Sequence, residues 1–531
     1  MPKYIFVTGG VLSGLGKGVV TASTGLLLKS MGYSVTAIKI DPYVNVDAGT
    51  MNPYMHGEVF VTEDGGETDL DIGHYERFLN IDLTKKHNIT TGKIFYSVIM
   101  KERRGEYLGK CVQIIPHVTD EIKNTIKEVV RESNADIALI EIGGTVGDIE
   151  SLPFLEAVRQ MRVEEGIRNT LYIHVALSPV ISTGEQKTKP VQHSVNELRR
   201  IGIQPDIIVV RSPRPLEKEN KNKIALHAML PPEAVFSNPD VDTIYRVPLI
   251  LHRNGYAKYI AEKLGIEYRE PDLSKWIDFV ERITNANKTV KIALIGKYTK
   301  IHDSYLSIIE ALKHGGAWNN VRVEFEWFES TDIERGLINV NEVLKYDGAV
   351  ILPGFGKRGA EGKIKAIEKL RERGKPLLGI CFGMELMVVE FARNIVGLEN
   401  ANSTELDPNT PYPVVDLLPS QKKLEMLGGT MRLGAYPIRI VRNTHAWNMY
   451  RSEVVYERHR HRYGVNPKYI DILESSGMLI SGWSDDGYPE LIEIKDYRTI
   501  YFGIQAHPEY KSRPLRPSPV FMYFVKMLIP E

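Results

Sequence analysis

Short apolar runs rich in β-branched residues recur along this chain of 531 residues, with helical patterns between them. Strands that alternate with helices are typical of βαβ units, which build parallel sheets covered by helices. The pattern therefore predicts an α/β fold in both halves of the chain. The predicted strands lie at residues 4–8, 34–39, 136–141, 171–176, 206–210, 290–295, 322–326, 348–352 and 376–380.

A polar stretch that includes Pro271 interrupts this pattern between residues 265 and 288. A new strand run begins at residue 290. We therefore expect two α/β domains, residues 1–265 and 290–531, joined by a linker at residues 266–289. The length agrees with this division, because about 150 residues per domain predicts two to four domains.

Composition excludes several classes of protein. Lysine plus arginine and aspartate plus glutamate number 67 each, so no overall positive field favours nucleic-acid binding. Cys111 and Cys381 are too few for a disulfide framework, which favours a reducing compartment, and we expect Cys111 to lie in a core. The apolar runs are too short to span a membrane, and the first residues lack a signal-peptide pattern. We expect a cytoplasmic protein that binds neither nucleic acid nor membrane.

A glycine-rich loop follows the first predicted strand. Residues 9–18 read Gly-Gly-Val-Leu-Ser-Gly-Leu-Gly-Lys-Gly, and a helical pattern continues to Ser30. Such a loop points backbone N–H groups and a helix N-terminus at a phosphate, and Lys17 would neutralise its oxygens. The glycine spacing is one residue too long for a P-loop, and Gly18 stands where Ser or Thr would hold Mg²⁺. A metal would need other ligands, and an ordinary β–α turn is the alternative.

Two acidic residues could supply those ligands. Glu141 ends a predicted strand, where α/β sheets place ligands, and Asp71 lies in an acidic loop. Their hard oxygen atoms, together with nucleotide phosphates, suit Mg²⁺. A further polar cluster contains Lys187 and Lys189, with Lys223 later in the chain, and could bind another phosphate chain. Taken singly, each of these features is more often a solvated surface.

The second half contains a strand–turn–helix pattern around Cys381. Glycines two residues before and after it give the spacing of a nucleophile elbow. We expect the helix N-terminus to lower the thiol pKa. His507 is a candidate base, and Glu509 could orient it. Residues 352–359 could offer oxyanion N–H groups, whereas a buried core thiol is the alternative for Cys381.

A set of long, ordered motifs resembles the CTP synthase family: residues 9–18, 39–43, 56–62, 141–151, 187–190, 428–434 and 458–463. The resemblance covers essentially the whole chain. It implies an N-terminal P-loop domain of the dethiobiotin-synthetase type, a parallel-sheet synthetase, followed by a class I glutamine amidotransferase domain. It further implies that ATP phosphorylates the 4-oxygen of UTP and that ammonia, from glutamine or free in solution, replaces the phosphate to give CTP.

The resemblance also implies residue roles. Phosphoryl transfer would use Lys17 and Lys39, and Mg²⁺ would be held by Asp71 and Glu141. ATP would be bound by Gly14, Leu15, Gly16, Lys17, Gly18, Val19, Asp71, Asp240 and Val241. UTP and inhibitory CTP would be bound by Ser13, Asp148, Ile149, Glu150, Lys187, Thr188, Lys189, Pro190, Val191, Gln192 and Lys223.

In the amidotransferase domain the implied catalytic residues are Cys381, His507 and Glu509. The implied glutamine pocket consists of Gly354, Phe382, Gly383, Met384, Glu385, Glu405 and Arg462. An ammonia gate would consist of Pro53, His56 and Val59. GTP as an allosteric activator, CTP as a feedback inhibitor and a homotetramer are further implications of the resemblance.

The chain departs from the family pattern at a few positions. Residues 353–356 read Pro-Gly-Phe-Gly, one glycine fewer than the usual Pro-Gly-Gly-Phe-Gly. Glu385 stands where the family has Gln, and a carboxyl group donates a hydrogen bond only when it is protonated. Gly464 stands where Glu is usual. These departures remove none of the expected catalytic residues.

Two other interpretations remain. A cobyrinic-acid-type ATP-dependent glutamine amidotransferase joins the same two kinds of domain, but it has no need of the motifs at residues 141–151 and 187–189. A non-catalytic P-loop assembly protein could carry the second domain as a relic. A relic has no need of Cys381, His507 and Glu509 together.

Overall fold

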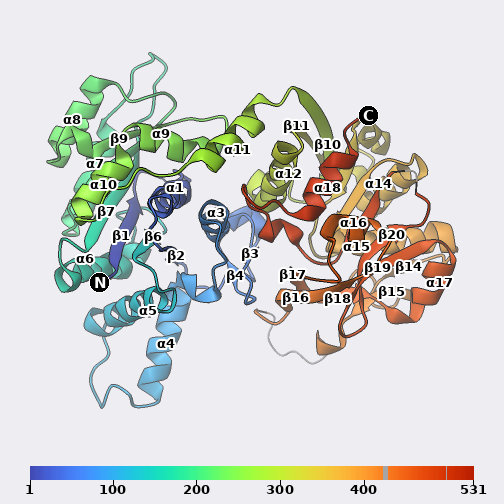
Figure 1. The fold of residues 1–531 in the computed structure, drawn as a ribbon. Helices are drawn as coiled ribbons and strands as arrows, with labels where there is room; N and C mark the ends of the chain where they lie inside the picture. The colour runs from blue at the N-terminus through green and yellow to red at the C-terminus, as the bar shows by residue number, and fades with distance from the viewer. Residues whose placement is uncertain (13, 422–427, 498, 531) are drawn as a thin grey trace. The chain divides into compact units, whose positions relative to one another are not determined.

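The structure is a computed structural model that describes residues 1–12, 14–421, 428–497 and 499–530. The chain forms two compact units. The first consists of Met1–Ala48 and Asp71–Val280, and the second of Gly49–Leu70 and Glu281–Glu531. Both are built from alternating strands and helices, as predicted (Figure 1).

The first unit contains a seven-stranded sheet in the order β5-β2-β6-β1-β7-β8-β9. All of its pairings are parallel, so the carboxyl ends of its strands share one edge. The strands are almost entirely buried, which explains their continuous apolar runs. They are β1 (Lys3–Gly9), β2 (Val35–Asp41), β5 (Asn88–Thr90), β6 (Ile137–Ile142), β7 (Thr170–Leu177), β8 (Ile207–Ser212) and β9 (Val235–Pro239).

Helices cover both faces of this sheet (Figure 1). One core contains Phe6 and Ile140 of the sheet with Ile122 and Phe154 of the helices. The helices of this unit are α1 (Lys17–Ser30), α3 (Leu70–Leu79), α4 (Thr91–Arg103), α5 (Thr119–Glu132), α6 (Leu152–Glu165), α7 (Lys189–Arg200), α8 (Lys218–Ala228), α9 (Val247–Arg253) and α10 (Tyr256–Leu264). A further helix, α11 (Ser274–Asn285), crosses the end of the unit at Val280. Helix α11 lies in the stretch expected to be a linker, where the Trp276 indole donates to Tyr245 O at 2.7 Å.

The second unit contains a nine-stranded sheet in the order β11-β10-β12-β13-β21-β20-β19-β16-β17. Pairings from β11 to β21 are parallel and those from β21 to β17 are antiparallel. The strands are β10 (Lys288–Gly296), β11 (Val321–Glu329), β12 (Gly348–Ile351), β13 (Leu377–Ile380), β16 (Arg432–Ile440), β17 (Val454–His461), β19 (Met478–Ser484), β20 (Pro489–Ile494) and β21 (Tyr501–Ile504). A small sheet adds β14 (Ala401–Ser403), β15 (Tyr412–Leu417) and β18 (Tyr463–Val465).

The described residues of this unit form two hydrophobic cores. One packs α14 and α15 through residues such as Ile367 and Met387, and the other packs α12 and α18 through Leu312 and Phe524. The helices are α12 (Leu306–Trp318), α13 (Ser330–Glu334), α14 (Ala360–Glu372), α15 (Phe382–Phe391), α16 (His445–Tyr450), α17 (Ile470–Ser475) and α18 (Pro519–Met527).

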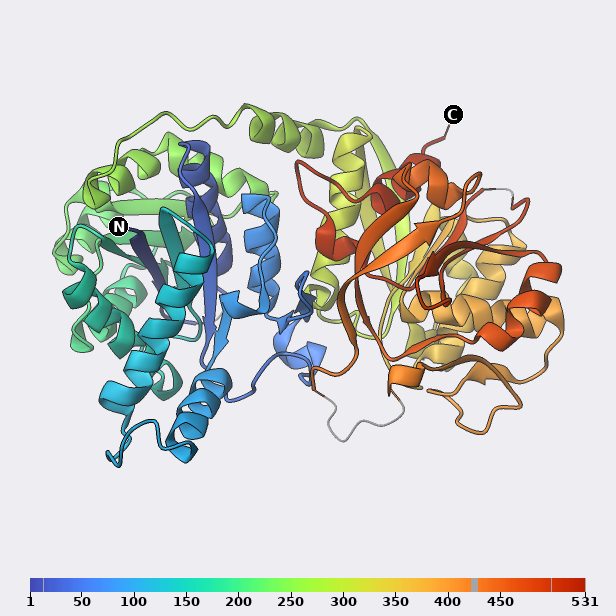
Figure 2. The same cartoon turned by 60° about the horizontal axis from the view of Figure 1, so that its bottom comes forward.

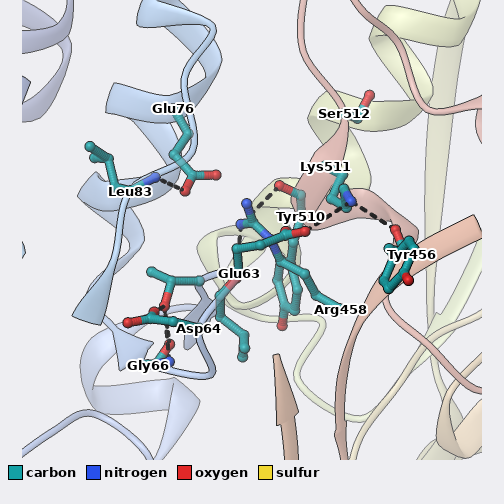
Figure 3. A network of polar contacts seen from close by, with 12 residues as sticks. Glu63, Asp64, Gly66, Glu76, Leu83, Tyr456, Arg458, Tyr510, Lys511 and Ser512 are labelled. Carbon is teal, nitrogen blue, oxygen red and sulfur yellow. Dashed lines mark hydrogen bonds and ion pairs between the residues drawn. The ribbon is translucent and has the colours of Figure 1, made fainter. Parts of the chain in front are cut away.

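The segment Gly49–Leu70 belongs to the second unit although the chain on either side of it belongs to the first. It contains α2 (Pro53–His56) and the hairpin of β3 (Phe60–Val61) and β4 (Glu67–Thr68), coloured blue in Figure 2. Arg458, whose side chain is 0% exposed, pairs with Glu63 at 2.9 Å, and Lys511 pairs with the other oxygen of Glu63 (Figure 3). These charges fix the segment to β17 and to the turn after β21.

Two of the sequence expectations concern the burial of Cys111 and the presence of membrane-spanning helices. Cys111 is exposed, so the expectation of a core cysteine was wrong. It follows the turns after α4 rather than lying in a strand or on a buried helix face. Within the described residues, we find no helix whose length and apolar character would let it cross a membrane.

Candidate functional site

The glycine-rich loop joins β1 to α1 at the carboxyl edge of the first sheet. Gly14 and Gly16 have φ angles of 73° and 83°, a left-handed conformation that glycine adopts without strain. Gly16 directly precedes α1, so the first N–H groups of the helix face the loop. A Cβ atom on Gly18 would lie 1.9 Å from Asp71 Oδ1, which explains why neither Ser nor Thr fits there.

A cluster of charged side chains lies beside this loop. Lys39 on β2 and Glu141 on β6 are paired in register, and the Lys39 ammonium donates to Glu141 Oε1 at 3.0 Å. Lys39 also forms an ion pair with Asp71, and Tyr75 donates to the other oxygen of Glu141. Lys17 donates to Gly144 O at 2.7 Å. The structure therefore brings together the four residues predicted for phosphoryl transfer and metal binding.

Burial controls the electrostatics of this cluster. It raises the pKa of Glu141, and the charge of Asp71 acts in the same direction while Lys39 opposes it. Burial lowers the pKa of Lys17, with nearby carboxylates opposing the shift. Three carboxyl groups, those of Asp41, Asp71 and Glu141, thus converge on one cation, the Lys39 ammonium. Hard oxygen donors arranged around a positive charge fit Mg²⁺.

Most of the other predicted nucleotide residues follow strands of the same sheet and so lie at its carboxyl edge, whereas Lys223 lies within α8. Gln192 donates to Thr188 Oγ1 at 3.0 Å at the start of α7, and Lys187 pairs with Glu185. Arg211 binds Asp240 at 2.8 Å after β9. The Val191 side chain packs in the core, so only its backbone can face a ligand. Ser13 lies outside the described residues.

The predicted nucleophile elbow is present in the second unit. Cys381 lies between β13 and α15 with a φ angle of 52°, and its N–H donates to Ile504 O at 2.7 Å. A Cβ on Gly379 would lie 2.2 Å from Met387 Sδ, and one on Gly383 would lie 2.2 Å from Ile351 O. Both glycines are therefore required by space, as the elbow pattern predicts.

A base and an acid stand in the same cavity as the thiol. His507 and Glu509 line, with Cys381, a cavity of about 300 Å³. His507 Nδ1 lies 2.6 Å from Glu509 Oε1, and His507 Nε2 has no hydrogen-bond partner among the described residues. The Cys381 thiol donates to Arg460 O at 3.7 Å. This arrangement leaves one imidazole nitrogen available for proton transfer.

The thiol pKa is opposite to the sequence expectation. Burial raises the pKa of Cys381 well above its ordinary value, and the carboxyl groups of Glu385 and Glu509 act in the same direction. The Phe382 N–H, at the helix N-terminus, lowers it by less. The expectation of a lowered thiol pKa was wrong because burial and acidic neighbours outweigh the helix terminus. The resting nucleophile is a protonated thiol.

Glu385 is fully enclosed at the start of α15. Gln505 donates its amide to Glu385 Oε1 at 2.9 Å, and Glu385 Oε2 has no partner among the described residues. Burial raises the pKa of Glu385 to about 8, with the charge of Glu405 adding to the shift and the Gln505 amide opposing it. The side chain is therefore a neutral carboxylic acid at pH 7, able to donate as the usual Gln does.

Among the described residues that line the cavity, Gly354 is the only one of the predicted glutamine residues, so the structure does not bring the predicted pocket together there. Gly354 lines the cavity, and Gly356 N donates to Glu405 Oε1 at 2.6 Å. Arg462 donates to Gln421 at 2.8 Å, and the Met384 side chain lies in a core instead of the cavity. The contact from Gln505 was missed by sequence reasoning, although this residue lies two positions before the predicted base.

The predicted gate residues belong to the second unit. Pro53 and Val59 line the cavity that contains Cys381, and Tyr510 donates to Val59 O at 3.0 Å. His56 is not among the lining residues; its Nδ1 lies 3.4 Å from Asp69. The segment Gly49–Leu70 therefore forms part of the cavity wall, which sequence order alone does not indicate.

A second buried cluster has residue types that bind metals. His459 Nδ1 lies 2.9 Å from His461 Nε2 and 3.7 Å from Glu490. Arg432 lies 3.6 Å from the same carboxyl group. Burial lowers the pKa of His461 to about 3 and raises that of Glu490 to about 8. A guanidinium beside the acidic member opposes binding of a divalent cation, so we interpret the cluster as a neutral polar network.

A phosphate-type loop with a lysine–carboxylate cluster in one unit and a Cys–His–Glu elbow in the other define an ATP-dependent glutamine amidotransferase. The family described as CTP synthase N-terminus matches residues 3–266, and glutamine amidotransferase class-I matches residues 300–527. The chain belongs to the CTP synthase family, whose members are C–N ligases with a glutaminase domain. The cobyrinic-acid-type alternative is not favoured.

Curated relatives match over the full chain. CTP synthase of Aeropyrum pernix is 62% identical over 526 residues, covering 98% of each chain. CTP synthase of Sulfolobus acidocaldarius is 59% identical over 528 residues, covering 99% of each. Among solved structures, the glutaminase domain of Trypanosoma brucei CTPS with bound acivicin is 30% identical, with a TM-score of 0.42, over 45% of this chain and 93% of that one.

Proposed function

We propose that this chain converts UTP to CTP, using ATP and ammonia obtained by hydrolysing glutamine. The observation that carries the proposal is the assembly of two complete sets of reactive side chains. The Lys39–Asp71–Glu141 cluster serves phosphoryl transfer, and the Cys381 elbow serves glutamine hydrolysis.

Glutamine hydrolysis begins with the neutral Cys381 thiol. His507 Nε2 accepts the thiol proton as Sγ attacks the carboxamide carbon, and it returns that proton to the departing ammonia. Glu509 holds Nδ1 of the ring and stabilises the imidazolium that forms. The N–H groups of Phe382, Gly354 and Phe355 would stabilise the developing oxyanion, because Pro353 has no N–H and the Gly356 N–H is bound by Glu405. Water then hydrolyses the thioester to glutamate.

In the first unit, the 4-oxygen of UTP attacks the γ-phosphate of ATP, and ADP leaves. Phosphoryl transfer depends on positioned positive charge, which Lys17 and Lys39 supply. Asp71 and Glu141 would hold Mg²⁺, which when bound adds positive charge to the phosphates. Ammonia then attacks C4 of the phosphorylated UTP, and inorganic phosphate leaves to give CTP.

The predicted subsites complete the proposal. Residues 14–19, with Asp240 and Val241, would contact ATP, and residues 187–192 with Ser13 and Lys223 would contact UTP. Residues 148–150 would contribute to CTP inhibition. Ammonia would leave the cavity past Pro53 and Val59, and His56 lies in the same short helix as Pro53. Activation by GTP, a homotetramer and a cytoplasmic location belong to the same proposal.

A comparison of nitrogen sources tests the proposal. Purified full-length chain with UTP, ATP and Mg²⁺ is supplied with either glutamine or ammonium chloride, and CTP formation is followed by absorbance. We expect CTP from both sources, and glutamate from glutamine only. No CTP from ammonia would refute the synthetase assignment, and CTP from ammonia alone would refute the glutaminase assignment.

A further inference from the structure

Lys363 is a fully buried cation in the second unit that the reaction described above does not use. It lies on α14, and its side chain is 0% exposed. No carboxylate in the described part of the chain lies within ion-pair distance of its ammonium. A buried charge without a counter-ion is costly, so its retention needs a specific reason.

The ammonium contacts residues next to both proposed sources of oxyanion N–H groups, the loop at residues 353–356 and the start of α15. It donates to Leu352 O at 2.6 Å, directly before the loop at residues 353–356. It also lies 5.1 Å from the ring centre of Phe382, the residue that follows the nucleophile. One side chain therefore connects the loop with the N-terminus of α15.

The same loop is held at further points along its backbone. The Tyr305 hydroxyl donates to Pro353 O at 3.4 Å, and the Lys297 ammonium donates to Gly356 O at 3.4 Å. Since a peptide's N–H and C=O point in opposite directions, fixing the carbonyl oxygens of Pro353 and Gly356 fixes the direction of the Gly354 and Lys357 N–H groups. The peptide after Leu352 has no N–H because Pro353 follows, so Lys363 acts by anchoring the start of the loop. This support matters for a loop that is one glycine shorter than the family pattern.

Charge supports the same conclusion. Burial lowers the pKa of Lys363 to about 7, the positive charge of Lys297 adds to the shift, and a Cys381 thiolate opposes it. Negative charge that develops at the elbow therefore stabilises the ammonium, and the ammonium stabilises that charge in return.

We propose that Lys363 is a positioning residue for glutamine hydrolysis: it holds the Leu352 carbonyl and the Phe382 ring so that the shortened loop and the start of α15 present their N–H groups to the oxyanion. This inference rests on the proposed glutaminase function. The Lys363 ammonium acts on the oxyanion site indirectly, through its hydrogen bond to the loop and through its charge.

Lys363→Met tests it, because Met retains the length and removes both donor and charge. We expect the glutamine-dependent kcat to fall about 100-fold, as on loss of one oxyanion donor, with KM for glutamine within about threefold. Ammonia-dependent synthesis and the unfolding midpoint stay at wild-type values. Lys363→Arg restores a donor and a charge, and we expect its kcat to exceed that of Lys363→Met at least tenfold.

Lys365→Met, an exposed change on the same helix, is the matched control and keeps wild-type kinetics. The inference is overturned if kcat of Lys363→Met stays within twofold of wild type, or if its KM rises tenfold or more. It is also overturned if Lys363→Arg is no more active than Lys363→Met. Absence of CTP from ammonia in the wild-type chain is a different failure, because it refutes the proposed function.

Discussion

The two candidate sites handle charge in opposite ways. In the first unit the Lys39 ammonium stands among the carboxyl groups of Asp41, Asp71 and Glu141, so its positive charge offsets part of their negative charge. In the second unit Cys381 and Glu385 carry protons. Phosphoryl transfer needs fixed charge around phosphates, whereas glutamine hydrolysis needs groups that exchange protons near neutral pH. The difference predicts which changes affect both nitrogen sources and which affect one.

The largest expected effect is that of Cys381→Ala. Removing the nucleophile should lower glutamine-dependent CTP synthesis by at least about 10⁴-fold, because no covalent intermediate can form. Ammonia-dependent synthesis should be unchanged, as measured by CTP absorbance with ammonium chloride. Cys111→Ala, at an exposed thiol, should behave as wild type. Loss of both activities in Cys381→Ala would contradict the division of labour between the units.

Lys39→Met should act in the opposite pattern. It removes the cation that compensates Asp71 and Glu141, so CTP synthesis from either nitrogen source should fall about 10²- to 10³-fold. Basal glutamine hydrolysis, measured as glutamate release, should persist. Lys258→Met, at an exposed position of the same unit, provides the control. If Lys39→Met lost only the glutamine-dependent reaction, the assignment of Lys39 to phosphoryl transfer would be wrong.

Glu385 should impose a pH dependence on glutamine use. Its pKa of about 8 means that it is protonated below that pH and becomes a carboxylate beside Glu405 above it. The KM for glutamine should therefore rise as pH increases through about 8. Glu385→Gln should flatten that rise, while the exposed Glu372→Gln should not. A wild-type KM that is constant from pH 6 to about 9 would show that the proton on Glu385 is not needed.

The smallest expected effect is on stability. Glu63→Gln removes the charge that compensates the buried Arg458, but Glu63 is about a third exposed, so solvent screens the loss. We expect about 1 kcal/mol of destabilisation and a decrease of roughly 2 °C in Tm. Glu453→Gln, in an exposed pair with Arg442, should change Tm by less than half as much. If calorimetry gave equal decreases in Tm for Glu63→Gln and Glu453→Gln, the Glu63–Arg458 pair would contribute no more to stability than an exposed pair.

Local patterns predicted much of the fold. The nine apolar runs correspond to β1, β2, β6, β7, β8 and β10 to β13, because burial on both faces leaves a signal in each strand. The elbow was also predictable, since Gly379 and Gly383 are required by space. The antiparallel strands β16, β17, β19 and β20 were not predicted, because their pairing depends on distant partners.

The electrostatics of the second site could not be predicted in the same way. A thiol at a helix N-terminus suggests a lowered pKa, but burial by the folded chain raises the pKa of Cys381, and two of its acidic neighbours, Glu405 and Glu509, come from distant parts of the chain. Lys363 did leave a signal. It precedes Ile367 by four residues and Leu370 by seven, the spacing of a buried helical face. A lysine on the buried face of a predicted helix indicates a buried polar contact, which the structure places at Leu352 O.

The path of the chain between the units has a practical consequence. A fragment beginning at residue 281 would lack Glu63 and Glu67, the carboxylate partners of Arg458 and Arg460. It would also lack Pro53 and Val59 from the lining of the chamber around the thiol. Ammonia released from glutamine in that fragment would diffuse into the solvent. A separately expressed second unit should therefore include residues 49–70, joined to the fragment that begins at residue 281.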